Sequence, residues 1–401
     1  MTSRERVLRS INHQQPDRVP IDLGATRQSG IAASAYHSLK RRLGVRTPTR
    51  VVDLIQFLAE VEQTILERFG VDAVGVFRPE TNPGLGIRRE NWKPWRLFDG
   101  TPVEIPGDFN PVLEPDGGYA MLRNGVPIAR MPKDGFYFER TEKYPGAAHV
   151  DVGEWKPHRW TNEELEYVHA QAEWLHKNTE YALVCCVNPP QELFTGMSTG
   201  DFEAWWSTLA SEPEYVHALF EKTTDVWLDN LKRFAQTVGS KVQVLQLTDD
   251  FGTQESLLLS VKMFRELIMP YYKRGLDWVH QNTQMKVLLH SDGAIFPLIP
   301  SLIEMGVDIL NPVQINAKGM EPWKLKKEYG EKMAFWGGAA DCQQTLPFGK
   351  PEDVAREVEA NVNALAPGGG YVCAAVHNIQ AGVPPENIVA LFDTARRKSL
   401  D

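Results

Sequence analysis

The feature that most constrains the fold is a series of eight short apolar runs, most of which are separated by longer segments with helical periodicity. The runs cover residues 18–23, 71–77, 181–187, 242–247, 286–289, 307–310, 333–336 and 371–375. Several of them are almost continuously apolar, which is typical of strands that are buried on both faces of a parallel sheet. Helical patterns cover residues 49–69, 162–178, 212–238, 260–281, 297–305 and 351–365, and residues 345–354 read as a loop that enters the last helix.

Alternating strands and helices predict an α/β fold, either an open sheet or a closed barrel. Eight repeats within 401 residues favour a single (β/α)8 barrel over residues 1–401, with its active site at the carboxyl ends of the strands. No G-x-G-x-x-G motif follows the first run, which argues against a dinucleotide-binding sheet.

Residues 91–151 interrupt this rhythm, because they are rich in proline, glycine and aromatic side chains. The sequences PDGG at 115–118 and RNGV at 123–126 are good hairpin turns. We therefore predict a β-hairpin insertion after the second strand, which lies over one end of the barrel. It is either a structural flap or a lid that closes on substrate.

The overall charge and the cysteines indicate a soluble, cytoplasmic protein. A formal net charge of -9 argues against nucleic acid as the main partner. The first residues resemble no signal peptide, and no apolar run is long enough for a membrane helix. None of the four cysteines forms a C-x-x-C pair; Cys185, Cys186 and Cys373 lie within apolar runs, and Cys342 lies in a polar loop.

Polar residues follow the ends of the predicted strands, where a barrel places its site. His290 and Asp292 stand two positions apart at a strand end, so their side chains are expected on the same face. The pair can be two metal ligands, an acid–base pair, or a structural hydrogen bond. Further candidates after the strands are Asp22, Arg27, Arg78, Asn188, Gln191, Gln254, Asn311, Gln314, Asp341, Asn378 and Gln380.

Asp249 and Asp250 are adjacent, so on a strand they point to opposite sides, and at most one of them faces the barrel mouth. Asp250 is the first choice, with Asp249 as the alternative. His377 is either a general acid or ligand, or a histidine whose hydrogen bonds are satisfied at the rim.

Several motifs resemble the uroporphyrinogen decarboxylase superfamily, and within it the methyltransferase-like branch. They are RERV at 4–7, RVPID at 18–22, DDFGTQ at 249–254, HSDG at 290–293, GVDILNPVQ at 306–314, WGG at 336–338, LPFG at 346–349, HNIQ at 377–380 and VPPEN at 383–387. The resemblance implies a (β/α)8 barrel. It also implies either decarboxylation of a tetrapyrrole or transfer of a methyl group to or from the cobalt of a corrinoid.

The decarboxylase motif R-Q-A-G-R-Y is matched here by RQSGIA at 27–32, which keeps Arg27 but lacks the second arginine and the tyrosine. Members that methylate thiols bind zinc through H-x-C and a later cysteine in A-P-G-C-G. Here Asp292 and Gly369 stand at the two cysteine positions. The resemblance therefore implies a site with harder ligands, or an acid–base site, rather than a thiol-activating zinc site.

The leading hypothesis is a methyltransferase that acts on a small O- or N-methylated compound and a corrinoid carried by a partner protein. His290, Asp292, His377 and Asp250 are the expected catalytic residues, with zinc as a candidate metal on His290 and Asp292. The expected substrate-binding residues are Arg27, Asp249, Gln254, Asn311, Gln314, Asn378 and Gln380. A homodimer is expected from base rates. The alternatives are a decarboxylase for a carboxylated ring and a barrel that binds a ligand without catalysis.

Overall fold

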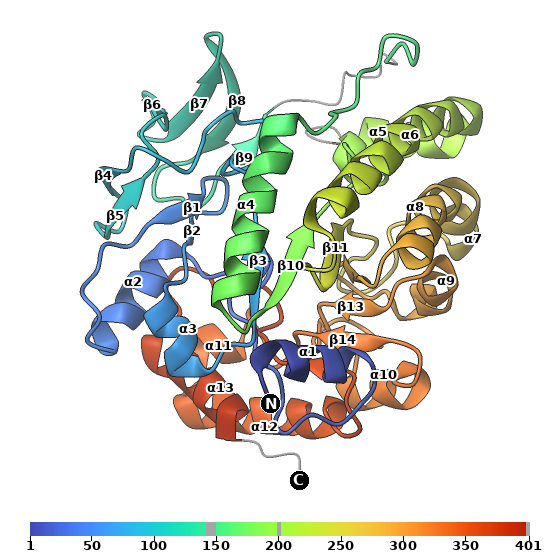
Figure 1. Cartoon of the computed structure of the whole chain (residues 1–401). Coiled ribbons are helices and arrows are strands. Elements are labelled where there is room, and N and C mark those ends of the chain that lie inside the picture. The colour runs from blue at the N-terminus through green and yellow to red at the C-terminus, as the bar shows by residue number, and fades with distance from the viewer. Residues whose placement is uncertain (142–149, 199–201, 398–401) are drawn as a thin grey trace.

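The computed structural model describes residues 1–141, 150–198 and 202–397, and a curled parallel sheet of seven strands forms its centre (Figure 1). The strands, in their spatial order, are β15 (Tyr371–Val372), β14 (Ala334–Trp336), β13 (Ile309–Asn311), β12 (Lys286–His290), β11 (Val244–Thr248), β10 (Ala182–Cys186) and β3 (Ala73–Val76). All six neighbouring pairs are parallel. The predicted α/β class with a parallel sheet is confirmed.

Helices surround this sheet, and two of them have the predicted bounds (Figure 1). Helix α4 (Asn162–Asn178) begins at a reciprocal cap, in which Thr161 accepts from the amide of Glu164 while the Glu164 carboxylate accepts from the amide of Thr161. Helix α12 (Pro351–Leu365) begins with proline in its first turn. The other large helices are α2 (Ala33–Arg42), α5 (Phe202–Ser211), α6 (Pro213–Val238), α8 (Met269–Asn282), α9 (Ile299–Met305), α10 (Pro322–Tyr329) and α13 (Pro385–Arg397).

Among the helices of the described ranges, none combines the length and the apolar character that crossing a bilayer requires.

The first predicted strand, residues 18–23, forms two isolated parallel bridges rather than a full strand. Ile21 pairs with Cys373 next to β15, and Asp22 pairs with Ala73 of β3. The amide of Cys373 donates to the carbonyl of Pro20 at 2.8 Å. Because Pro20 has no amide hydrogen of its own, the hydrogen-bond ladder cannot continue through it. The segment nevertheless contacts both edges of the seven-stranded sheet.

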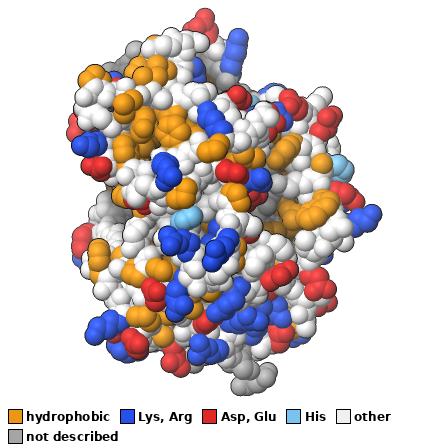
Figure 2. All heavy atoms as spheres, turned by 90° about the vertical axis from the view of Figure 1, so that its left-hand side faces the viewer, with side chains coloured by type: hydrophobic (Ala, Val, Ile, Leu, Met, Phe, Trp, Pro, Cys, Tyr) orange, Lys and Arg blue, Asp and Glu red, His pale blue; other side chains and the backbone are white. Residues whose placement is uncertain are grey.

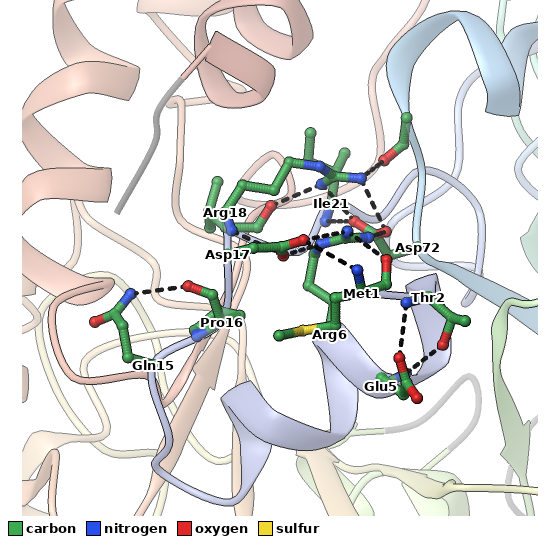
Figure 3. A network of polar contacts seen from close by, with 12 residues as sticks. Met1, Thr2, Glu5, Arg6, Gln15, Pro16, Asp17, Arg18, Ile21 and Asp72 are labelled. Atoms are coloured by element: carbon green, nitrogen blue, oxygen red, sulfur yellow. Dashed lines mark hydrogen bonds and ion pairs between the residues drawn. The ribbon is translucent and has the colours of Figure 1, made fainter. Parts of the chain in front are cut away.

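A buried carboxylate ties this segment to β3 at the amino end of the sheet (Figure 3). Asp72 is fully buried and accepts from the guanidinium groups of Arg6 and Arg18, each at 2.7 Å, and from the amide of Ile21 at 2.9 Å. Arg6 lies on α1 (Ser3–Ile11) and also binds Asp17 at 2.6 Å. One carboxylate therefore joins α1, the segment 18–23 and β3.

A small apolar core, separate from the main one, fills the inside of the curled sheet. Its members occupy alternate strand positions, and Val7 and Ile11 of α1 add to it from the amino end. The strand residues are Ala73, Ala182, Val184, Val244, Leu288, Ile309, Ala334, Trp336 and Val372. These side chains fill the interior, so it cannot hold a substrate. A site is therefore expected at the carboxyl ends of the strands.

The predicted helix over residues 49–69 is wrong in its first half. The chain there forms β1 (Val51–Asp53) and β2 (Leu58–Ala59), and helix α3 covers only Gln63–Phe69. The carboxylate of Asp53 accepts from the amides of Ile55 and Gln56 and so stabilises a turn. Phe57 has a φ of 50°, which a helix does not allow. Gly70 ends α3 in the left-handed conformation, as predicted.

Two other predicted segments differ in detail. The helix expected over residues 260–281 consists of α7 (Val261–Met263), a π-helical turn (Phe264–Ile268) and α8. The loop expected over residues 345–354 contains a short helix, α11 (Thr345–Phe348), before α12.

Between β3 and α4 the chain forms two antiparallel sheets, which lie at the upper left of Figure 1. One contains β4 (Lys93–Arg96) and β5 (Pro102–Ile105); the other contains β6 (Val112–Leu113), β7 (Tyr119–Arg123), β8 (Val126–Met131) and β9 (Glu139–Arg140). Asn124 and Gly125, with φ values of 52° and 79°, form the β7–β8 turn. Residues 142–149 of the expected insertion lie outside the described residues.

The antiparallel sheets leave large hydrophobic side chains exposed, and Figure 2 shows such side chains gathered on the upper part of this face. Those of the second sheet and the turn beside it are Val112, Leu113, Leu122, Val126, Phe136 and Tyr137. Whether this segment moves as a lid stays a prediction.

Candidate active site

All four predicted catalytic side chains meet at the carboxyl ends of the parallel strands. His290 is the last residue of β12, and its Nε2 atom lies 3.8 Å from Oδ2 of Asp292 and 3.9 Å from Oδ1 of Asp250, which follows β11. His377 follows β15, and its Nε2 atom lies 3.9 Å from the same Oδ2 of Asp292. The rings of His290 and His377 have centroids 5.4 Å apart. The structure therefore brings together residues from three strand ends.

The buried imidazole of His290 is held in one orientation by Asn311. These two residues are in register on neighbouring strands, and His290 Nδ1 lies 2.7 Å from Asn311 Oδ1. The amide nitrogen of Asn311 donates to the carbonyl of Trp336 at 2.9 Å, which fixes the amide's orientation. Nδ1 of His290 must therefore donate to Asn311, and Nε2 faces the two aspartates.

His377 has the same arrangement with its neighbour Asn378. The Nδ1 atom of His377 lies 3.0 Å from Oδ1 of Asn378, whose amide nitrogen donates to Gln56 at 2.5 Å. Gln380 also donates to Oδ1 of Asn378. Nδ1 of His377 is therefore the donor, and its Nε2 lone pair faces Asp292.

These distances are too long for direct hydrogen bonds but suit ligand atoms around one ion. The three ligand atoms offered by His290, Asp292 and His377 all lie within 4.8 Å of one another. Zinc binds imidazole nitrogen and carboxylate oxygen at about 2.0–2.2 Å, so its ligand atoms lie roughly 3–4 Å apart. Imidazoles that bind metal also donate their second N–H to an oxygen, as both histidines do here. A direct structural hydrogen bond between His290 and Asp292, one of the three interpretations, is absent.

Electrostatics at the site shift the pKa of His377 downward and the pKa of Asp250 upward. Burial lowers the pKa of His377, and the nearby charge of Asp292 opposes this shift only in part. For Asp250, burial and the charge of Asp292 raise the pKa, although the imidazole of His290 and the amide of Asp292 partly offset the shift. Its side chain keeps 44% of its surface exposed at the mouth.

Asp249 points away from the mouth, as expected for the neighbour of Asp250. Its Oδ1 accepts from the amide and the hydroxyl of Thr195, and its Oδ2 accepts from the amide of Phe194 and the hydroxyl of Tyr272. Burial raises its pKa to about 6 despite these donors. Since each oxygen already accepts two hydrogen bonds, we revise its assignment from substrate binding to structural support.

Glu192 is a candidate that sequence reasoning missed. It follows β10, one position after Gln191, and its carboxylate accepts from Asn188 at 2.9 Å. Burial and the carboxylates of Asp249 and Asp250 raise its pKa to about 8. The sequence offered only a weak signal for Glu192. It is an acidic residue after a predicted strand, in a loop that already contained the candidates Asn188 and Gln191.

The guanidinium group of Arg27 already has protein partners, so it is not available to pair with a substrate carboxylate. Its Nε atom lies 2.7 Å from Oδ2 of Asp53, which is almost fully buried, and one terminal nitrogen donates to the carbonyl of Thr81 at 2.6 Å. Its charge is therefore largely balanced within the protein.

The remaining predicted substrate-binding residues contact protein groups. Asn311 and Asn378 orient the two histidines, and Gln380 binds Asn378. Gln314 accepts from the amide of Gly293 at 2.6 Å, which stabilises the loop after His290. Gln254 is exposed and donates to Gln343 at 2.7 Å.

The cysteines offer no thiolate to this site. Cys342 is half-buried, its thiol donates to the carbonyl of His377, and burial raises its pKa to about 12. Burial also raises the pKa of Cys373 to about 12. Gly369, matched in sequence to a zinc-binding cysteine, precedes β15 and contacts Gln14, so it lies at the opposite end of the strands from the mouth. His377 completes the cluster instead.

Comparison with known proteins connects this chain to a family. Residues 140–398, more than half of the chain, match the family described as uroporphyrinogen decarboxylase (URO-D). Uroporphyrinogen decarboxylase 2, chloroplastic, from Oryza sativa subsp. japonica is 26% identical over 79% of this chain and 78% of its own length. Uroporphyrinogen decarboxylase from Azoarcus sp. (strain BH72) is 24% identical over 51% of this chain and 54% of its own length.

A solved structure with a similar fold is a methyltransferase from Methanosarcina mazei. It superimposes with a TM-score of 0.58 over 99% of this chain and 98% of its own, at 16% sequence identity. This likeness concerns the fold. The family match shows that the chain belongs to the uroporphyrinogen decarboxylase family.

Proposed function

We propose that this chain is a methyltransferase that moves a methyl group from a small O- or N-methylated compound to a corrinoid carried by a partner protein. In this proposal the seven strands and the segment 18–23 act as a closed eight-stranded barrel, and both substrate and corrinoid approach its carboxyl end. The observation that carries the proposal is the convergence of the Nε2 atoms of His290 and His377 on one oxygen of Asp292.

The donor set fits a divalent metal such as zinc. Two imidazole nitrogens and one carboxylate oxygen face a common point, and Asn311 and Asn378 hold both imidazoles in the tautomer that a metal requires. A bound ion would supply Lewis acidity to the oxygen or nitrogen that loses its methyl group. The lack of a thiolate in the described cluster suits oxygen and nitrogen chemistry better than activation of a thiol.

Asp250 is the proposed proton donor, because it faces the mouth and is not one of the three clustered ligands. When the methyl group leaves as a cation to the nucleophilic cobalt, the substrate heteroatom keeps the bonding electron pair. A proton delivered from Asp250 to that atom balances the step. The charge of Asp250 contributes to the raised pKa of Glu192, which places a second carboxyl group near the proposed proton donor.

The test is to mix the protein with reduced corrinoid protein and a panel of methyl ethers and N-methylated amines, and to follow methylcobalamin by absorbance. We expect at least one substrate to react with the wild type and not with Asp292→Asn. A panel that yields no methylcobalamin contradicts the proposal.

Decarboxylation is the second candidate, because the similar proteins from Oryza sativa and Azoarcus are uroporphyrinogen decarboxylases. Against it, Arg27 is paired with Asp53, and Ile31 and Ala32 replace the second arginine and the tyrosine of the decarboxylase motif. Release of carbon dioxide from uroporphyrinogen without any corrinoid would support the decarboxylase instead.

A further inference from the structure

A cavity of about 460 Å³ lies beside β3, and its lining contains none of the four residues that meet at the candidate active site. It is bounded by the segment after Asp22, by β1 and β2, and by helices α3 and α4. Its walls include Arg27, Asp53, Phe77, Arg89, Trp92 and Tyr167. Basic groups and flat aromatic rings therefore meet in one hollow.

Arg89 is a cation without a protein counter-ion in this cavity. Its Nε atom is buried and has no hydrogen-bond partner among the described residues. Within the described part of the chain, no carboxylate lies within ion-pair distance of its guanidinium group, which packs 4.7 Å from the centre of the Phe77 ring. Arg89 is half-buried and borders the cavity, and a buried donor without a partner is unfavourable, so this arrangement calls for an anion.

The neighbouring charges do not satisfy Arg89. The cavity is lined by three arginines and two carboxylates. Asp53 forms an ion pair with Arg27 at 2.7 Å, and Arg50 forms an ion pair with Glu104 at 3.1 Å. The second carboxylate of the lining, Glu60, is exposed at the rim.

We propose that this cavity binds a small monocarboxylate with a flat, apolar body, and that Arg89 receives the carboxylate group. A guanidinium can donate two parallel hydrogen bonds to a carboxylate, a geometry that a lysine cannot reproduce. Phe77, Trp92 and Tyr167 offer flat surfaces to the rest of the ligand. One uncompensated positive charge matches one carboxylate better than a multiply charged group.

The charge state of Arg89 is consistent with this role. Burial and the nearby charge of Arg27 lower its pKa to about 10, which still leaves the guanidinium protonated at neutral pH. The proposal does not depend on the chemistry at His290, Asp292 and His377.

The experiment is a calorimetric titration of the full chain with benzoate, with benzyl alcohol as the uncharged probe of similar shape. We expect benzoate to bind and benzyl alcohol to bind at least ~10-fold more weakly. Arg89→Gln should weaken benzoate binding by at least about tenfold, and Arg89→Lys should weaken it less. The matched control is Arg88→Gln, because Arg88 lies next in sequence but binds Glu163 and Glu90 outside the lining. The Arg88→Gln variant should bind benzoate as tightly as the wild type does.

Thermal unfolding without ligand shows whether the variants fold. Since Arg89→Gln removes a charge that has no protein counter-ion and a buried Nε atom without a partner, its midpoint should equal or exceed that of the wild type. His290→Ala should bind benzoate normally, even if it loses all methyl transfer. The proposal is overturned if benzoate does not bind, if Arg89→Gln binds it like the wild type, or if His290→Ala rather than Arg89→Gln abolishes binding. Inorganic phosphate that binds more tightly than benzoate also contradicts a monocarboxylate site.

Discussion

The Nε2 atom of His377 and the Oδ2 atom of Asp292 lie 3.9 Å apart, although their strands, β15 and β12, are separated by two others in the sheet. Neighbouring strands are about 4.8 Å apart, so such a contact would not form across a flat sheet. The curl of the sheet around its carboxyl end is what brings the two side chains together.

Removing either histidine should abolish most of the proposed activity. We expect His290→Ala and His377→Ala each to lower kcat/KM for methyl transfer by about 100-fold or more, because each change removes one of three converging donors. His280→Ala is the control, since His280 binds Asp308, which precedes β13 at the opposite end of the strands. If the three variants behave alike, the cluster is not catalytic.

The amide that orients His290 should matter almost as much as the histidine itself. Asn311→Ala leaves Nδ1 of His290 without its acceptor and frees the ring to change tautomer. We expect a loss of about 10–100-fold in metal affinity or activity. Asn282→Ala serves for comparison, because that amide only donates to the carbonyl of Trp278 at the end of α8. Full activity of Asn311→Ala would contradict the assigned tautomer.

The carboxylate that ties the amino end of the sheet should be important for stability. Asp72→Asn leaves the charges of Arg6 and Arg18 without their shared partner, so the free energy of unfolding should fall by about 3–5 kcal/mol. Asp17→Asn should cost about 1 kcal/mol or less, because Asp17 is 42% exposed. Urea unfolding followed by circular dichroism measures both. Equal effects of the two changes would show that burial of Asp72 is unimportant.

Glu192 should make stability depend on pH in a direction opposite to that of a salt-bridged acid. Its pKa rises from 4.5 to about 8 on folding, owing to burial and to Asp249 and Asp250, with the hydrogen bond from Asn188 and the charge of Arg140 acting in the other direction. Between these values the unfolded chain releases a proton that the folded chain keeps, so the folded state loses stability as pH rises.

Glu192→Gln removes this penalty. Its stability relative to the wild type should therefore increase between about pH 5 and about pH 8, as measured by urea unfolding at each pH. A difference that stays constant or decreases over this range contradicts the protonated state of Glu192.

Much of the fold could be predicted from the sequence, because buried parallel strands and capped helices leave local signals. Helices α4 and α12 carry caps or proline at their starts, and their bounds were correct. The region of β1 and β2 has helix-like apolar spacing, but the hydrogen bonds of Asp53 override it. Hydrophobic periodicity does not report such side-chain turns.

The site could be predicted only in part. The spacing of His290 and Asp292 at a strand end indicated their common face, and strand order placed His377 at the same rim. The mutual distances depend on the curl of the sheet, and the partners of Asp249 and Arg27 come from distant loops. The raised pKa of Glu192 arises from burial, which no local pattern reveals.

The most direct test of the central claim is a zinc titration of the metal-free chain against a competing chromophoric chelator. The proposed metal centre requires one tightly bound ion per chain, with affinity lowered at least about tenfold in each of His290→Ala, Asp292→Asn and His377→Ala and unchanged in His280→Ala. Absence of stoichiometric binding, or binding that these three changes leave intact, would contradict a metal centre formed by His290, Asp292 and His377.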